Sequence, residues 1–269
     1  MPNTILITGS SSGIGKATAI HFAEEGWNVV ATMRTPEKAG DWVKHKNITL
    51  TRLDVLELDS IQQAISDTIN KFGRIDTVVN NAGYGLVGPF EASTNEQIQR
   101  QFDTNVFGLM NVCREIIPHF REQRSGTIIN VASMGGRLTF PLYSLYHGTK
   151  WAVEGFSESL QFELQPFNIR VKIIEPGAIK TDFYDRSMDV ISKPGLTAYD
   201  EYVNKAMPNM NKFGEKAPGP EKVAAAIFKA TTDGSEKLRY QVNSAQLLAL
   251  RRLLPLSWFQ SIVRKVVLK

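Results

Sequence analysis

Two side chains that could exchange protons stand four residues apart in the sequence, Tyr146 and Lys150. They fall at the start of a predicted helix, where residues at this spacing project from the same face. A free tyrosine has a pKa of about 10, and a nearby cation favours its phenolate. Such a pair can give a proton to a substrate oxygen on which negative charge develops. Because this spacing is common in sequences, the pair carries weight only together with other signals.

A second chemical signal is the glycine-rich stretch from Thr8 to Gly15, which joins an apolar run to an amphipathic one. Glycines at such a turn let the backbone approach a pyrophosphate, and the next helix offers unpaired N–H groups at its N-terminus. Glycine loops also end hairpins and cap helices, but this one lies between a first strand and a first helix. The candidate cofactor contacts are Gly9, Ser11, Ser12, Gly13, Ile14 and Gly15.

The elements that must position these residues alternate along the chain, with short β-branched runs between amphipathic stretches. The predicted strands are Thr4–Thr8, Trp27–Thr32, Ile48–Asp54, Ile75–Asn80, Thr127–Val131 and Ile169–Ile174. The predicted helices are Lys16–Glu25, a segment opened by a capping box of Ser60 and Gln63, and a long one from about Asn95 to Arg124. The runs are apolar without alternation, as in strands buried on both faces. We therefore expect one α/β domain over residues 1–269, a doubly wound parallel sheet with helices on both faces.

The G-x3-G-x-G spacing of the turn resembles that of the short-chain dehydrogenase/reductase family, and further motifs agree in order with it. They are Asp54-Val55 after the third strand, Asn80-Asn81-Ala82-Gly83 after the fourth, and Pro176-Gly177 with Thr181 after the sixth. The resemblance implies a Rossmann-type fold with a nicotinamide cofactor. It places Asp54 and Val55 at the adenine, Asn81, Ala82 and Gly83 beside the cofactor, and Pro176, Gly177, Ile179 and Thr181 at the nicotinamide. The sequence is most similar to the hydroxysteroid and retinol dehydrogenase branch and its uncharacterised bacterial relatives.

The resemblance also adds Ser133 and Asn105 to the first pair, which completes the family's Asn-Ser-Tyr-Lys tetrad. In the implied roles Tyr146 supplies the proton, and Lys150 lowers the phenol pKa and binds the nicotinamide ribose. Ser133 orients the substrate oxygen, and Asn105, on a locally opened helix, positions a water that links Lys150 to solvent. The predicted reaction is hydride transfer between nicotinamide and a carbonyl or secondary alcohol on an apolar substrate. A non-catalytic NADP(H) redox sensor and a 3-ketoacyl reductase stay open as alternatives.

The end of the second predicted strand indicates which nicotinamide cofactor is bound. The sequence there offers Met33 and Arg34 and no carboxylate for a ribose 2′-hydroxyl. The planar donor fork of Arg34 suits a 2′-phosphate, and Ser10 and Ser11 could add hydroxyl contacts. We therefore predict NADP(H) in preference to NAD(H), which favours reduction; a solvated surface arginine is the alternative.

Other residues argue against a metal site and against further catalytic side chains. The four histidines and the single cysteine, Cys113, show no metal-ligand spacing, so no metal is predicted. His147 should point about a quarter-turn from Tyr146, which disfavours a catalytic role, and Tyr143 is expected in the pocket or in packing. With no disulfide, no leader-like N-terminus and no membrane-spanning apolar run, we expect a cytoplasmic protein.

The stretch 182–220 breaks the alternation with many prolines, glycines and aromatic residues. It follows a strand at the edge where open α/β sheets bind ligands, which favours a substrate lid over an ordinary surface excursion. An apolar or aromatic substrate is expected between the predicted walls. The predicted wall residues are Leu86, Val87, Phe90, Met134, Leu138, Phe140, Tyr143, Phe183, Tyr184 and Met188.

The net charge of +4 is concentrated in the C-terminal tail, residues 247–269, and from Tyr240 onward there is no acidic residue. The rest of the chain is close to neutral, which argues against a nucleic-acid-binding face. Apolar and basic residues together are typical of a membrane-surface segment, although a terminal helix packed on the domain or on a neighbouring subunit is the favoured alternative. The family resemblance implies a homodimer or homotetramer through the long helices that begin near Asn95 and Tyr146.

Overall fold

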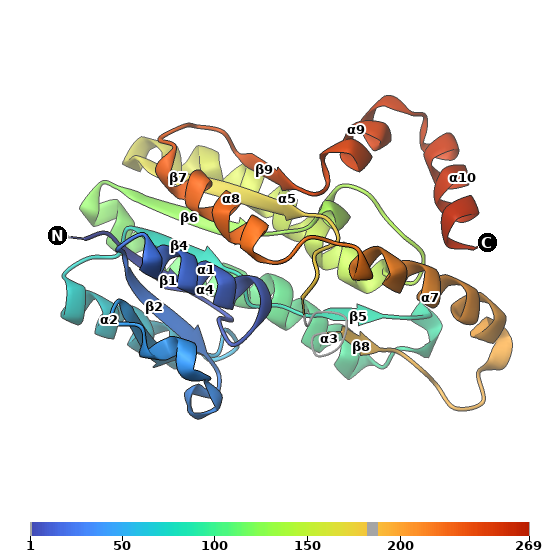
Figure 1. The fold of residues 1–269 in the computed structure, drawn as a ribbon, viewed down its shortest axis with the longest axis horizontal. Helices are drawn as coiled ribbons and strands as arrows, with labels where there is room; N and C mark the ends of the chain where they lie inside the picture. Colours follow the sequence, from blue (N-terminus) through green and yellow to red (C-terminus); the bar gives the residue numbers. More distant parts are fainter. Residues whose placement is uncertain (1, 182–187, 269) are drawn as a thin grey trace.

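The computed structural model describes residues 2–181 and 188–268 (Figure 1). Seven parallel strands form one sheet in the order β3-β2-β1-β4-β6-β7-β9. In chain order they are β1 (Thr4–Ile7), β2 (Asn28–Met33), β3 (Ile48–Arg52), β4 (Thr77–Asn80), β6 (Gly126–Val131), β7 (Ile169–Pro176) and β9 (Arg239–Val242). The predicted doubly wound parallel sheet is thus confirmed, and the six predicted strands end within two residues of their predicted bounds.

Helices cover both faces of the sheet. One face packs on α2 (Leu58–Phe72), α4 (Gly108–Gln123) and α5 (Ser144–Leu164), and the other on α1 (Gly13–Glu24) and α8 (Glu221–Thr232). Successive side chains of a strand point to opposite faces, so Leu6 packs in the first core and its neighbours Ile5 and Ile7 in the second. This is why the strands are apolar without alternation.

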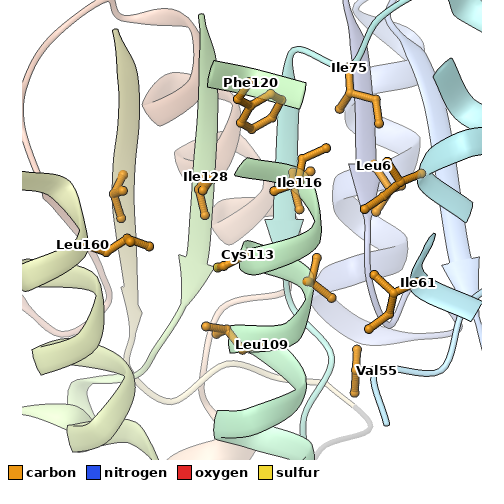
Figure 2. Close-up of a cluster of buried hydrophobic side chains, with 14 of the residues drawn as sticks. Leu6, Val55, Ile61, Ile75, Leu109, Cys113, Ile116, Phe120, Ile128 and Leu160 are labelled. Carbon is orange, nitrogen blue, oxygen red and sulfur yellow. The ribbon is translucent and has the colours of Figure 1, made fainter. Parts of the chain in front are cut away.

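Helix α4 shows how one helix fills the first core. Leu109, Cys113, Ile116 and Phe120 recur at helical spacing and point toward the strands, as Figure 2 shows. The ring of Phe120 packs so closely on the start of β6 that a Cβ on Gly126 would lie 2.3 Å from it. The position therefore requires glycine.

The predicted capping box at Ser60 is wrong. Helix α2 begins at Leu58, and Ser60 lies in its first turn. Its hydroxyl accepts a hydrogen bond from the Asp54 amide at 2.9 Å, which joins the helix to the chain after β3. A capping box does open α3 (Asn95–Phe102), where Thr94 and Gln97 bond each other's backbone amides at 3.2 and 3.0 Å.

The long helix predicted from about Asn95 to Arg124 is interrupted. A π-helical turn at Asp103–Phe107 separates α3 from α4. Three strands escape prediction because they are short or lie at an edge: β5 (Gly85–Val87), which pairs with β8 (Met188–Val190), and β9.

The C-terminal tail and part of the predicted lid are helical; residues 182–187 of the lid lie outside the described residues. Helix α7 (Asp200–Glu215) runs through Pro208, and the tail forms α9 (Ala245–Leu253) and α10 (Leu256–Val267). These helices lie beyond the sheet at the end where β5 and β8 lie (Figure 1). The Asn209 amide donates to the Val267 carbonyl at 3.1 Å, which ties α7 to α10. Among the described helices, none is both long and apolar enough to cross a bilayer.

The core role of α4 predicts a large loss of stability when Phe120 is truncated. Phe120→Ala should lower the free energy of unfolding by about 3–5 kcal/mol, because it removes a fully buried ring and leaves a cavity. Phe90→Ala is the matched control, since its ring is 59% exposed, and should change stability by less than about 0.5 kcal/mol. Urea unfolding measures both, and equal effects would contradict this packing.

Candidate functional site

A cavity of about 710 Å³ lies along the carboxyl ends of β1, β2, β4, β6 and β7. Of the residues predicted for the tetrad and for the family's cofactor motifs, it brings together all except Gly15 and Asn105. Those that line it are Gly9, Ser11, Ser12, Gly13, Ile14, Arg34, Asp54, Val55, Asn81, Ala82, Gly83, Ser133, Tyr146, Lys150, Pro176, Gly177, Ile179 and Thr181. Motifs spread over more than 170 residues meet there because parallel strands end at one edge of the sheet.

The glycine-rich turn is held against the end of β4. Gly9 has φ +66°, and a Cβ there would lie 2.8 Å from the Ala82 Cα. The Asn81 side-chain amide donates to the carbonyl oxygens of Thr8 and Gly9 at 3.0 and 2.9 Å, which fixes the path of the turn. Gly15 does not line the cavity, and a Cβ there would lie 2.4 Å from the Gly9 oxygen, so the position requires glycine for close packing.

The first turn of α1 opens into the cavity. The N-cap residue Ser12 makes no side-chain capping bond, and Gly13, with φ +52°, leaves room where a side chain would stand. Backbone N–H groups at a helix N-terminus hold anions. This cradle, with its missing Cβ atoms and uncapped amides, fits the pyrophosphate of a dinucleotide.

Arg34 lies at the end of β2 with its side chain exposed at the cavity, and Ser11 lines the same region. The contact expected from Ser10 is wrong. Ser10 is fully buried, and its hydroxyl donates to the Ile7 carbonyl at 3.0 Å. Of Ser10 and Ser11, only Ser11 lines the cavity.

Lys150 extends from α5 into the middle of the cavity. Its ammonium donates to the Val131 carbonyl at the end of β6, at 2.9 Å, and lies 5.8 Å from the ring centre of Tyr146. Burial lowers the pKa of Lys150 to about 8, while the carboxylate of Glu154 acts in the opposite direction. The cation is therefore held beside the phenol, as the spacing predicts.

Ser133 follows β6 and also faces the cavity. Its hydroxyl accepts from the Gly135 amide at 3.0 Å and lies 3.5 Å from the Pro176 carbonyl. These contacts fix the side chain across the cavity from the glycine-rich turn. A hydroxyl held in this way can bond a substrate oxygen.

Asn105 lies behind the cavity, in the π-helical turn. Its amide nitrogen donates to the Tyr84 carbonyl at 2.8 Å and to the Thr149 hydroxyl at 3.2 Å, and its oxygen accepts from the Tyr84 amide at 3.0 Å. The side chain thus joins the segment after β4 to α5. The water-holding role expected of Asn105 stays a prediction.

His147 clamps the loop that follows Ser133. Its Nε2 accepts from the Phe140 amide at 3.0 Å, so Nδ1 carries the proton and donates to the Gly135 carbonyl at 2.9 Å. Burial lowers the pKa of His147 to about 4, which keeps the ring neutral. His147 lines the cavity as well, yet both ring nitrogens are occupied by the backbone.

A buried cluster of charged side chains lies near Lys150, and the sequence did not predict it. Arg239 Nε lies 3.0 Å from a Glu154 oxygen and 3.4 Å from a Glu175 oxygen, and Arg137 lies 3.2 Å from Glu175. Burial raises the pKa of Glu154 to about 7, and the neighbouring Glu175 carboxylate adds to this. Among the described residues, no group of three His, Cys, Asp or Glu side chains is arranged to hold a metal.

The far end of the cavity is apolar, and its walls differ in part from those predicted. Met134, Phe140 and Tyr143 line it as expected. Leu86, Val87 and Leu138 are buried in packing clusters, Met188 contacts the Tyr143 hydroxyl at 3.8 Å, and the surface position of Phe90 shows that its assignment is wrong. Phe183 and Tyr184 lie outside the described residues.

Helix α7, which belongs to the predicted lid, reaches the cavity, and so do α9 and α10, which the sequence did not place there. They contribute Met210, Phe213, Leu247, Phe259, Ile262, Val263, Val266 and Val267. The apolar residues of α10 recur at helical spacing, which signals a buried face but not its partner. The favoured prediction of a terminal helix packed on the domain agrees with this position.

Comparison with known proteins gives the family context. The family model for short chain dehydrogenase matches residues 3–189. An uncharacterized oxidoreductase of Schizosaccharomyces pombe is 42% identical over 81% of this chain and 92% of its own length. The 3-ketodihydrosphingosine reductase of Bacteroides thetaiotaomicron is 36% identical over 90% of this chain and 88% of its own length. Human retinol dehydrogenase 8 is 33% identical over 90% of this chain and 82% of its own length.

Solved structures agree with these relatives. A short-chain dehydrogenase from Streptomyces avermitilis has a TM-score of 0.82 and 32% identity, with 98% of each chain covered. ElxO with NADP bound has a TM-score of 0.72 and 25% identity over 90% of this chain and 98% of its own. A Burkholderia phymatum dehydrogenase in complex with NAD shares the fold. Its TM-score is 0.80, with 22% identity over 93% of this chain and 92% of its own. Because the family model and relatives of at least 33% identity extend over the strand ends that build the cavity, this chain belongs to the short-chain dehydrogenase/reductase family and is an oxidoreductase.

Proposed function

We propose that this protein uses NADPH to reduce the carbonyl group of an apolar substrate to a secondary alcohol. The observation that carries the proposal is one cavity whose lining combines Ser133, Tyr146 and Lys150 with the glycine-rich turn and with a set of apolar side chains. The turn can hold a dinucleotide and the apolar chamber an apolar molecule, so their reacting ends would meet at the phenol.

The residues that would hold the cofactor follow the cavity from end to end. The first turn of α1 holds the pyrophosphate, Arg34 the 2′-phosphate, and Asp54 and Val55 the adenine. The nicotinamide end is held by Asn81, Ala82, Gly83, Pro176, Gly177, Ile179 and Thr181. When bound, this cofactor supplies or accepts a hydride.

The chain's own groups handle the proton and the charge. Tyr146 donates its phenolic proton to the substrate oxygen as negative charge develops there. Lys150, fixed by the Val131 carbonyl at 2.9 Å, provides the cation that lowers the pKa of the phenol. Ser133 donates a hydrogen bond to the same oxygen and orients the carbonyl. Asn105 joins the segment after β4 to α5 and positions a water toward Lys150.

Two observations support an apolar substrate. The far chamber is lined by side chains such as Phe140, Met210 and Phe259. Two relatives are named for 3-ketodihydrosphingosine and retinol, molecules with mostly apolar carbon skeletons. The described part of the segment 182–220 contributes Met210 and Phe213 to this chamber, which supports its role as a substrate lid.

A homo-oligomer is part of the proposal. Phe107, Trp151 and Phe162 expose large apolar side chains on the π-helical turn and on α5. Members of this family commonly assemble through these helices, and the exposed rings fit a subunit interface.

Tyr146→Phe should remove turnover while cofactor binding persists. Purified protein should oxidise NADPH with at least one of a panel of aromatic, steroid, retinoid and ketoacyl carbonyl compounds. The variant should lose at least about 100-fold in kcat, because its ring has no proton to give. Tyr143→Phe, the matched control, should keep most of its turnover.

Two outcomes would count against the proposal. Tight NADPH binding without turnover on any compound would favour a redox sensor. Turnover by Tyr146→Phe close to that of the unaltered chain would refute the role of the phenol.

Arg34→Ala should change cofactor preference. Loss of a charge-assisted, bidentate contact with the 2′-phosphate should raise KM for NADPH by about 10- to 100-fold and leave KM for NADH nearly unchanged. Arg52→Ala, on the surface beside Glu57, is the control. Steady-state kinetics with both cofactors measure the effect. Equal changes in KM for NADPH and NADH would show that Arg34 does not contact the 2′-phosphate.

The rate of reduction should fall as pH rises through about 8. Lys150 loses its proton there, because burial lowers its pKa to about 8, and the phenol then loses the cation that lowers its own pKa. The value of kcat/KM should be flat below this pH and decline about tenfold per unit above it. Lys150→Arg stays charged, so the decline of its remaining activity should no longer follow the lysine pKa near 8 and should occur only where the phenol itself loses its proton. A flat profile for the unaltered chain between pH 6 and pH 10 would contradict the role of Lys150.

A further inference from the structure

Helix α10 carries two adjacent apolar rows. Phe259 and Val267 are buried, with Val263 between them at the same i, i+4 spacing. The neighbouring row of Trp258, Ile262 and Val266 is 64%, 40% and 50% exposed. A helix that only packed on the domain would bury both rows of its apolar stripe.

Two further apolar side chains are exposed at the turn between α9 and α10, Leu253 and Leu256, at 80% and 50%. Large apolar side chains are thus exposed on two consecutive helices, and an exposed apolar patch marks an interaction site. We define the docking face as Leu253, Leu256, Trp258, Ile262 and Val266.

The docking face borders the cavity. Ile262 and Val266 line the cavity and are also exposed to solvent. Phe213 of α7 also lines the cavity and is exposed to solvent. An apolar molecule could therefore pass from the docking face into the chamber without crossing a polar rim of α10.

Basic side chains flank the docking face. Arg251 and Arg252 end α9, and Arg264 and Lys265 lie in the last turn of α10. From Tyr240 to the last residue, the sequence has five basic residues and no acidic one. Within the described parts of the chain, these four side chains form no ion pair.

We propose that the docking face binds the surface of an anionic lipid bilayer, and that the substrate is a bilayer-dissolved carbonyl compound that enters the cavity past Ile262 and Val266. An amphipathic helix with a basic polar face and an exposed tryptophan suits a lipid surface. The entry of substrate from the bilayer rests on the proposed carbonyl reduction, whereas the binding of the docking face to the bilayer does not.

Charge distinguishes the bilayer from a second copy of the chain as the partner. In a twofold interface the same patch lies on both subunits, so arginines and lysines would face one another. Anionic lipid headgroups complement those charges instead, and each cation near such a surface strengthens binding by about fivefold. The sign of the charge therefore favours lipid.

Sedimentation with vesicles tests the docking. The full chain should sediment with vesicles of phosphatidylcholine and phosphatidylglycerol, and much less with phosphatidylcholine alone or at high salt. Trp258→Ala and the double variant Arg252→Gln/Lys265→Gln should each weaken binding, the latter by about fivefold per charge removed. The matched controls are Phe90→Ala, with an aromatic side chain 59% exposed outside the docking face, and Lys44→Gln/Lys46→Gln; both should bind as the unaltered chain does.

Vesicles that contain brominated lipids locate the contact. They should quench the fluorescence of the unaltered chain, and Trp258→Phe should lose this quenching while it still sediments with the vesicles. No sedimentation with anionic vesicles would overturn the proposal. Concentration-dependent dimers that Trp258→Ala dissociates, without vesicle binding, would assign the face to a second copy and overturn it too.

Activity separates docking from substrate supply. Arg252→Gln/Lys265→Gln should slow reduction of a long-chain ketone held in anionic vesicles and leave reduction of a water-soluble aromatic ketone unchanged. Equal rates for this variant and the unaltered chain on the vesicle-borne ketone would refute delivery from the bilayer. Vesicle binding without reduction of any ketone would instead refute the proposed reaction and leave the docking intact.

Discussion

The site depends on a half-buried ammonium group, that of Lys150. A cation partly removed from water needs compensation, and here the Val131 carbonyl and the nearby Glu154 carboxylate provide it. Glu154 is itself held by Arg239, which also approaches Glu175. The cluster ties α5 to β7 and to the edge strand β9, so the position of the cation is set by the sheet.

A second constraint is the close contact between the ends of β1 and β4. The glycine-rich turn can approach the end of β4 only because Gly9 lacks a Cβ, and Asn81 holds it there with two hydrogen bonds. His147 acts similarly on the other side, where it clamps the backbone after Ser133 at Gly135 and Phe140. Backbone segments that carry no chemistry of their own thus determine where the reacting groups stand.

The sequence was sufficient for the sheet and for most cavity residues, because strands buried on both faces are apolar runs and each motif directly follows one of them. It was insufficient where a residue's neighbours come from distant elements. Nothing local distinguishes buried Ser10 from exposed Ser11, or places Phe90 on the surface. The amphipathic pattern of α10 indicates a buried face, but only the fold shows that this face closes the cavity.

The central claim is that a hydride passes from NADPH to a substrate carbonyl carbon in this cavity. Reduction of a ketone with NADPH that carries two deuterium atoms at C4 of its nicotinamide, followed by mass spectrometry of the alcohol, tests it directly. The account predicts one deuterium, retained on the carbinol carbon after exchange in water. An alcohol without deuterium would show that its hydrogen comes from solvent and would contradict the account.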